Sequence, residues 1–252
     1  MNEWGQKMNG EWGQSPYLLY TPLMARQARV DIANIPYHVI NRAVGRARIF
    51  TKDRDYELFV DLLASAKEKT GMNILAFAAM PNHWHLVLFP EKEGDMKTFM
   101  HLFTNAHTRR VHTITNTNGT GPLYQGRYKS FIIETDAHLL TVIKYVERNP
   151  VRARLAKKVD EWRWGSGWIR VHGTLKQKKL LAESPTPLPK NYRTWVNLEE
   201  KDDILKQLRT STIKSSPFGS DDWVQRMVDT YELEATLRGR GRPKGAKNSK
   251  KK

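Results

Sequence analysis

The chain has 252 residues, of which 39% are hydrophobic, so it can form one ordinary domain with appendages or two small domains. No stretch approaches the roughly 18 apolar residues of a membrane helix, and the N-terminus lacks a basic segment followed by an apolar one. We therefore expect neither an integral membrane protein nor a conventionally secreted one. Because cysteine is absent, disulfides, thiolate zinc sites, iron–sulfur clusters and a cysteine nucleophile are excluded. Any metal must be held by His, Asp, Glu, Asn or Gln.

Charge is the strongest compositional signal. The chain carries 42 Lys and Arg residues against 26 Asp and Glu residues, which gives a formal net charge of +16. Such a charge predicts a polyanionic partner, above all nucleic acid, whereas the alternative is a basic protein with a solvated surface. Half of the excess lies in residues 238–252, where eight positions are basic and none is acidic.

In chain order, residues 1–23 come first and contain a short repeat, Glu-Trp-Gly-Gln, without helical or strand periodicity. We expect a disordered extension there. Residues 37–41 are rich in β-branched and aromatic side chains and predict a strand. Apolar residues at helical spacing then predict a helix over residues 53–69, which Gly71 stops.

Two apolar runs follow, at residues 73–79 and 83–89, and the short Pro-Asn sequence between them favours a tight turn. This pattern is typical of a buried antiparallel hairpin. Residues 96–113 repeat apolar side chains on one helical face and predict a second helix. The stretch 116–122 is rich in Asn, Thr, Gly and Pro and predicts a loop.

The last part of the core begins with residues 123–133, which look extended. Asp136 or Thr135 can then cap a helix that Pro150 ends. The resulting order is strand, helix, strand, strand, helix, strand, helix, which is a βαββαβ core with one appended helix. The sequence therefore predicts an α+β fold, a ferredoxin-like antiparallel sheet with helices on one face.

The chain beyond the core changes in character, with several tryptophans, then Lys- and Pro-rich residues, then weaker helical patterns. We expect five regions: a disordered extension (1–23), a folded domain (24–170), a basic Pro/Lys linker (171–190), a small helical region that contacts DNA (191–237) and a disordered basic tail (238–252).

The sharpest local motif is His83-Trp84-His85, in the second strand of the predicted hairpin. Side chains two residues apart on a strand share a face, so both imidazoles project together while Trp84 points to the other side. Two imidazoles on a buried strand need polar partners, and such a pair can bind one metal ion. The alternative is a pair of histidines that ordinary hydrogen bonds satisfy.

A second candidate group lies on the last core helix. Its apolar stripe is formed by Leu139, Ile143 and Val146. Tyr145 lies roughly opposite Ile143, so it is not an obvious core residue. Asn149 follows four residues later on the same face, where its carboxamide oxygen can act beside the tyrosine hydroxyl. The alternative is an amphipathic helix with a half-exposed tyrosine and an asparagine that caps its C-terminus.

Together the two groups define a mechanism. Two histidines on a strand and Asn149 on a helix would hold a hard divalent ion, Mg²⁺ or Mn²⁺, which neutralises and orients a scissile phosphate. Tyr145 would attack that phosphate, and because an unactivated phenol has a pKa of about 10, its deprotonation accompanies the attack. The ester between tyrosine and DNA stores the phosphodiester energy, so a broken strand can be rejoined without ATP. This design suits transposition.

The same residues carry a family resemblance. It lies in the run from Arg26 to Arg42, in Met80-Pro81-Asn82-His83-Trp84-His85-Leu86-Val87-Leu88, in Tyr124-Gln125-Gly126-Arg127-Tyr128-Lys129-Ser130 and in Tyr145-Val146-Glu147-Arg148-Asn149-Pro150-Val151-Arg152-Ala153. Four motifs in this order resemble the REP-associated tyrosine transposases of bacteria, which belong to the HUH single-tyrosine superfamily. The resemblance covers about residues 24–168 and makes 24–170 an HUH tyrosine transposase domain.

By this resemblance, His83 and His85 are the paired metal histidines, Tyr145 is the nucleophile and Asn149 is the third ligand. Trp84 departs from the smaller aliphatic residues that are usual between the histidines, but it points away from the metal face. The resemblance implies a metal-dependent single-stranded DNA endonuclease and strand transferase that leaves a 5′-phosphotyrosine and a free 3′-OH.

The implied substrate is a REP-type palindrome folded as a hairpin, with a short flanking tetranucleotide read near the cleavage site. Flanking duplex DNA is a further candidate partner. The resemblance also implies a bacterial cytoplasmic, nucleoid-associated protein with no membrane partner. The sequence leaves open whether it is a monomer or a homodimer.

Basic and aromatic side chains are suitably placed to contact DNA. The phosphate-binding candidates are Arg42, Arg46, Arg48, Arg109, Arg110, Arg127, Lys129, Arg152 and Arg154, and Tyr124 or Tyr128 can stack an unpaired base. Tyr128 is also the rival nucleophile. In the tail, Arg240, Arg242 and Lys244 belong to a sequence that resembles an AT-hook, which lies in a narrow minor groove; a plain polybasic tail is the alternative.

The main alternative function is a non-catalytic regulator or architectural protein that binds palindromic DNA. The intact histidine pair, tyrosine and asparagine argue against lost catalysis. A carboxylate-based two-metal nuclease would need converging acids, whereas Asp53, Asp55 and Asp61 fall on a helix surface.

Overall fold

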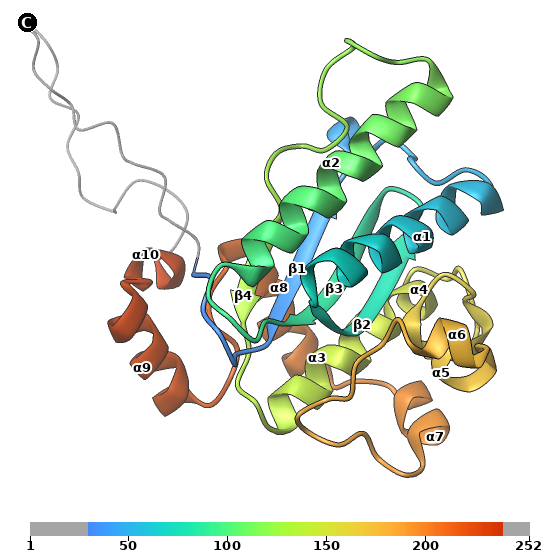
Figure 1. Cartoon of the computed structure of the whole chain (residues 1–252). Coiled ribbons are helices and arrows are strands. Elements are labelled where there is room, and N and C mark those ends of the chain that lie inside the picture. Colours follow the sequence, from blue (N-terminus) through green and yellow to red (C-terminus); the bar gives the residue numbers. More distant parts are fainter. Residues whose placement is uncertain (1–29, 239–252) are drawn as a thin grey trace, which may run out of the picture.

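The computed structural model describes residues 30–238 of the chain (Figure 1). Its core elements are β1 (Tyr37–Arg42), the 3-10 helix η1 (Val44–Arg46), α1 (Asp53–Thr70), β2 (Asn73–Met80), β3 (His83–Phe89), α2 (Asp95–Thr115), β4 (Lys129–Ile132) and α3 (Ala137–Glu147). Then come α4 (Asn149–Arg152), η2 (Val159–Glu161), α5 (Ser166–His172), α6 (Leu175–Lys178), α7 (Tyr192–Asn197), α8 (Asp202–Lys214), α9 (Asp221–Tyr231) and α10 (Glu234–Leu237). The predicted βαββαβ order with an appended helix is confirmed. No helix within residues 30–238 is long and apolar enough to cross a membrane.

The four strands form one antiparallel sheet in the order β2-β3-β1-β4. In the pairing of β1 with β3, Ile40 lies opposite His85 and Arg42 lies opposite His83. Directly opposed residues of an antiparallel pair share a face of the sheet. His83, His85, Ile40 and Arg42 therefore lie on one face, which we call the α3 face.

The other face of the sheet is covered by α1 and α2, which lie side by side across it (Figure 1). Phe59 of α1 and Phe103 of α2 pack with Trp84 of β3 in the larger hydrophobic core. Trp84 thus points away from His83 and His85, as predicted. Gly71 ends α1 in the left-handed conformation, with φ 72°, which glycine adopts without steric cost.

The helix α3 covers the α3 face, so the sheet carries helices on both sides. Its apolar residues pack with Ala76, Ala78 and Val87 of the hairpin in a second core cluster, to which α8 adds Leu205 and Leu208. The two helices of the ferredoxin-like core lie on one face as predicted, and the appended helix adds a third layer. This layer brings the last motif of the sequence against the strand that carries the histidine pair.

Two sequence expectations about α3 need correction. Tyr145 is only 6% exposed and belongs to the core, because the sheet covers one side of α3 and the C-terminal part of the chain covers another. A helical wheel with one apolar stripe predicts one packing partner, whereas α3 packs against both the sheet and the C-terminal part of the chain. Pro150 does not end the helix, since α3 ends at Glu147 and Pro150 lies in the first turn of α4, where its missing N–H costs nothing.

The stretch 123–133 forms less strand than expected. Only β4, at Lys129–Ile132, pairs with β1 along its length, whereas Tyr124 makes a single bridge to Ala43. The edge of β4 is extended from elsewhere in the chain: Phe218 N–H donates to Ile132 O at 3.0 Å, and Phe218 O accepts from Glu134 N–H at 3.0 Å.

The segment 171–190, expected as a linker, is packed onto the core. Ala182 N–H donates to Ile74 O at 2.9 Å, at the outer edge of β2, and Lys67 Nζ donates to the carbonyls of Lys179 and Leu180. The helical region 191–237 is present and also contacts the core through α8 and Phe218. The five-region division remains a prediction, and the extension 1–23 and the tail from 239 lie outside the described residues.

Candidate active site

The candidate nucleophile and the two candidate metal histidines lie between β3 and α3. The ring centroids of His83 and His85 are 5.1 Å apart. The Tyr145 ring centroid lies 6.1 Å from that of His85, with the rings nearly perpendicular. Two motifs that are 60 residues apart in the sequence therefore meet in one place, as the sequence analysis predicted.

A third histidine, which the sequence analysis did not select, completes this group. His38 of β1 is fully buried, and its Nε2 lies 2.8 Å from His85 Nδ1. Its ring centroid is 6.1 Å from that of Tyr145 and 4.8 Å from that of Phe131. The available signal was weak, because His38 comes close to His85 only through the pairing of β1 with β3.

The neighbouring residue Asn82 orients the first histidine. Asn82 Oδ1 lies 2.6 Å from His83 Nδ1, and Asn82 Nδ2 donates to Arg46 O at 3.2 Å. Because the carboxamide oxygen can only accept, His83 carries its hydrogen on Nδ1. Its Nε2 lone pair is then available to a ligand.

Burial keeps both candidate ligands neutral at pH 7. It lowers the pKa of His83 to about 4, with the nearby positive charge of Arg42 acting in the same direction. Burial also lowers the pKa of His85 well below 6.5, assisted by His38, His83 and the charges of Arg152 and Arg42. Neutral imidazole is the form that binds metal ions, so the site is poised for a cation at neutral pH.

The donor atoms present suit a divalent cation. Within residues 30–238, no hydrogen bond engages Nε2 of either His83 or His85, since their bonds to Asn82 and His38 use Nδ1. Asn149, the first residue of α4, turns its Nδ2 toward the last turn of α3 and donates to Tyr145 O at 3.1 Å, which leaves its Oδ1 as an acceptor. Imidazole nitrogens and a carboxamide oxygen are donor types that suit a divalent ion.

The only cluster of three His, Asp or Glu ligand atoms within 4.8 Å of one another, among the described residues, lies elsewhere, at Glu134, Asp136 and His138. Its atoms already have structural partners. Glu134 accepts from Ser220 N–H at 2.6 Å, and Asp136 caps α3 by accepting from His138 N–H at 2.7 Å. This cluster is explained by the start of α3 and is separate from the histidine pair.

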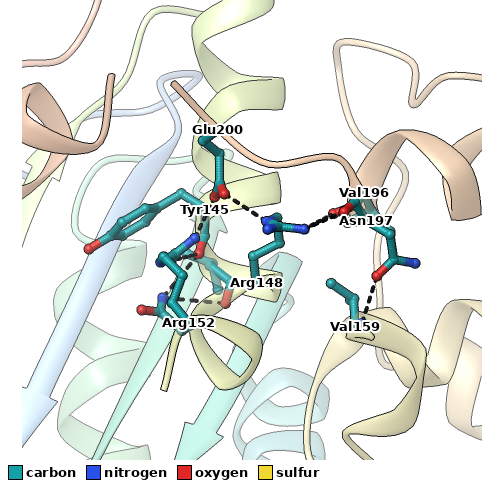
Figure 2. Close-up of polar contacts among 9 residues, drawn as sticks. Tyr145, Arg148, Arg152, Val159, Val196, Asn197 and Glu200 are labelled. Atoms are coloured by element: carbon teal, nitrogen blue, oxygen red, sulfur yellow. Dashed lines mark hydrogen bonds and ion pairs between the residues drawn. The ribbon is translucent and has the colours of Figure 1, made fainter. Parts of the chain in front are cut away.

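Charged groups fix the other side of Tyr145 (Figure 2). The Arg152 guanidinium lies over the Tyr145 ring, 4.3 Å from its centroid, and it also donates to Tyr145 O. Glu200 accepts from Arg152 and, at 2.6 Å, from Arg148 Nε. Arg148 also donates to Asn197 O at 2.6 Å. Figure 2 shows the phenol hydroxyl pointing away from this charged group. The group therefore contacts the ring and backbone of Tyr145 and leaves the hydroxyl on the other side.

The sequence analysis assigned Arg152 to DNA phosphates, and the structure instead places its side chain between Glu200 and Tyr145, 17% exposed. Glu200 was not identified from the sequence, because 55 residues separate it from Tyr145 and no motif contains it. Of the remaining basic candidates within residues 30–238, Arg42 is partly buried. The others are exposed: Arg46, Arg48, Arg109, Arg110, Arg127, Lys129 and Arg154. Arg109 and Arg110 belong to α2, on the opposite side of the sheet from the histidines.

Arg42 is a basic candidate beside the histidine pair. It lies opposite His83 in the strand register, and its Nε is buried without a hydrogen-bond partner among the described residues. Arg42 also lines a groove of about 360 Å³ together with Arg127, Lys129 and the end of α8. Three basic side chains therefore line this groove, and one of them, Arg42, lies opposite His83 in the sheet.

Neither tyrosine proposed to stack a base lies free on the surface. Tyr124 is 6% exposed, and its hydroxyl lies between Trp84 Nε1, at 2.9 Å, and His107 Nδ1, at 2.6 Å. This corrects the expectation for Tyr124, which is a core residue of the α1 and α2 side. Tyr128 is half-buried against the same core. That position lies across the sheet from His83 and His85, and it disfavours Tyr128 as the nucleophile. The tail candidates Arg240, Arg242 and Lys244 lie outside the described residues.

Comparison with known proteins shows one family similarity. Residues 31–149 match the family model described as "Transposase IS200 like", a segment that contains the histidine pair, Tyr145 and Asn149. The chain is similar to this family over those residues, which agrees with the resemblance that its motifs carry.

Two solved structures are similar to this chain. The REP-associated tyrosine transposase bound to a REP hairpin is 17% identical, with a TM-score of 0.48, over 57% of this chain and 82% of that one. A putative transposase from Deinococcus radiodurans is 19% identical, with a TM-score of 0.34, over 49% of this chain and 96% of that one. No curated protein matches the chain.

Proposed function

We propose that this protein is a transposase, a metal-dependent single-stranded DNA endonuclease and strand transferase that acts on palindromic, REP-type hairpins through Tyr145. The observation that carries the proposal is the meeting of Tyr145 with His83 and His85 on the α3 face, with the Tyr145 ring 6.1 Å from that of His85. A structural tyrosine would need no such neighbours. The resemblance of the motifs to REP-associated tyrosine transposases supports the hairpin as substrate.

The basic groove beside His83 supports single-stranded DNA as the form that is cut. Arg42, Arg127 and Lys129 line it, and each can contact a backbone phosphate. Because Arg42 lies opposite His83 in the sheet, a strand in this groove passes the histidine pair. Its phosphates would then reach the space in front of Tyr145.

In the proposed reaction, Tyr145 Oη forms a bond to the scissile phosphorus and the bond from phosphorus to the 3′ oxygen breaks. The phenol proton passes to water, and the departing 3′ oxygen takes up a proton to become a free 3′-OH. The DNA end then remains as a 5′-phosphotyrosine. Attack by another 3′-OH on this ester reverses the step, so the strand is transferred without a nucleotide cofactor.

His83, His85 and Asn149 would hold a divalent ion, Mg²⁺ or Mn²⁺, which when bound neutralises the charge of the phosphate. Asn82 and His38 hold the two imidazoles, and Arg152 holds the Tyr145 ring. The chain thus fixes the nucleophile and the candidate ligands before DNA binds, which lowers the entropic cost of reaching the reactive geometry.

Formation of a covalent adduct tests this proposal. Wild-type protein with Mn²⁺ and a palindromic single-stranded oligonucleotide should give an adduct that survives denaturing electrophoresis. Tyr145→Phe should give none, whereas Tyr128→Phe should behave as wild type. An adduct with Tyr145→Phe would refute the assigned nucleophile. Tight hairpin binding without an adduct, for wild-type protein on every palindrome tried, would favour the non-catalytic DNA-binding protein.

A further inference from the structure

His38 occupies an unusual position in the site. Its side chain is fully buried between His85, Phe131 and Tyr145. Only its Nε2 has a partner, His85 Nδ1 at 2.8 Å, and its Nδ1 is buried without a hydrogen-bond partner among the described residues. Burying an unpaired polar atom costs free energy, so the arrangement calls for a reason beyond packing.

Two neutral imidazoles can share this hydrogen bond in two ways. If His38 Nε2 donates, His85 carries its own hydrogen on Nε2 and offers no lone pair to a metal ion there. If His85 Nδ1 donates, the His85 Nε2 lone pair is free, and His38 then carries its hydrogen on the unpartnered Nδ1. The two states have the same number of protons and differ only in tautomer.

For His83, the first histidine of the pair, the tautomer is fixed. Asn82 Oδ1 lies 2.6 Å from His83 Nδ1 and can only accept, so the hydrogen of His83 stays on Nδ1. Metal-binding histidines commonly donate their second ring N–H to an acceptor, which fixes the tautomer and the ring orientation. For His83 that acceptor is Asn82, and within residues 30–238 the group in the corresponding position for His85 is His38.

We propose that His38 is a positioning residue, which accepts the hydrogen of His85 Nδ1 and so directs the His85 Nε2 lone pair toward the metal ion. This inference rests on the metal site of the proposed function. In the metal-free protein His38 permits both tautomers, and a cation selects the one in which His85 donates. His38 therefore sets metal affinity without touching the metal.

The test compares Mn²⁺ affinity, measured by calorimetry, across matched variants of the full chain. His38→Phe keeps a ring of similar size and removes the acceptor, so Mn²⁺ should bind about 10- to 100-fold more weakly. His38→Gln supplies a carboxamide oxygen as acceptor, and its affinity should return to within a few-fold of wild type. If His38 had a purely structural role, His38→Gln would not restore the Mn²⁺ affinity.

His107 provides the control for burial. Like His38, His107 is fully buried. Its Nδ1 lies 2.6 Å from Tyr124 Oη, and its Nε2 is buried without a hydrogen-bond partner among the described residues. It lies on the opposite side of the sheet, against Phe50 and Phe59. His107→Phe should therefore leave Mn²⁺ affinity unchanged. Equal losses in His38→Phe and His107→Phe would refute a specific role for His38.

A spectroscopic readout tests the tautomer directly in the wild-type protein. Long-range ¹H–¹⁵N correlation spectra with Mg²⁺ should show His85 with its hydrogen on Nδ1. A hydrogen on Nε2 of Mg²⁺-loaded His85 would overturn the inference even if His38→Phe failed to fold. Wild-type Mn²⁺ affinity in His38→Phe would overturn it as well. If His83→Ala with His85→Ala bound Mn²⁺ as wild type does, the metal site of the proposed function would itself be wrong.

Discussion

The contact between Glu200 and the arginines behind Tyr145 makes a quantitative prediction. Glu200 has a side chain that is 4% exposed, and its two oxygens contact Arg148 and Arg152, one oxygen each. Glu200→Gln keeps the shape and one acceptor but removes the negative charge. Two guanidinium groups, 6% and 17% exposed, would then lie in a poorly solvated site without a counter-charge.

Breaking a buried ion pair by removing one partner costs about 3–5 kcal/mol. Arg148 keeps Asn197 O and Arg152 keeps Tyr145 O as acceptors, so we expect the lower end, about 3 kcal/mol. For a protein of this size, such a loss lowers the midpoint of thermal unfolding by about 6–12 °C. Urea denaturation of wild type and variant, with the midpoint and slope compared, gives the free energy of unfolding directly.

Glu57→Gln is the matched control. Glu57 pairs with Arg54 at 3.7 Å, but the two side chains are 40% and 80% exposed, and exposed pairs of this kind contribute at most about 1 kcal/mol. Glu200→Gln should therefore destabilise the protein several times more than Glu57→Gln. Equal and small effects would refute the argument that Glu200 stabilises the segment behind Tyr145.

Three further predictions concern the metal site, the tail and acid stability. His83→Ala with His85→Ala should stop DNA cleavage, while hairpin affinity in EDTA stays within a few-fold of wild type; loss of both with unfolding would indicate structural histidines instead. Deleting residues 238–252 should weaken DNA binding and reduce the slope of log K against log salt by about 0.7 per lost single-strand contact or about 0.9 per duplex contact. Cleavage of saturating oligonucleotide should survive, and an AT-hook would cost more affinity on A·T-rich than on G·C-rich duplex. Burial lowers the pKa of His107 to about 4, so the neutral form is favoured in the folded protein, and stability present above pH 6.5 should be lost as pH falls toward 4. In urea titrations at pH 7 and pH 5, His107→Phe should lose less stability on acidification than wild type, and an equal loss would show that His107 does not contribute.

Local periodicity was sufficient to predict the part of the site that depends on one element at a time. The alternation of side chains along a strand placed His83 and His85 together and Trp84 on the other face, and the structure has this arrangement. The element order also predicted the βαββαβ core. These features depend on the backbone geometry of single elements and their order, which the sequence encodes locally.

The remaining features depend on contacts between distant segments. His38 reaches His85 through the pairing of β1 with β3, and Glu200 reaches Arg152 because the C-terminal segment folds back over α3. Tyr145 and Tyr124 are buried by elements that a single helical wheel or strand pattern does not include. Sequence periodicity describes the faces of an element, whereas burial depends on what covers each face.

The chemical identity of the protein–DNA linkage tests most directly whether Tyr145 is the nucleophile that cuts the DNA. The protein is incubated with Mn²⁺ and a hairpin oligonucleotide labelled at either its 5′ or its 3′ end, and the adduct is digested and sequenced by mass spectrometry. The 3′-labelled part should be bound to the protein through Tyr145, while the 5′-labelled part should be released with a 3′-OH that a polymerase extends. A nucleotide attached to any other residue, or a released strand with a 3′-phosphate, would contradict this assignment.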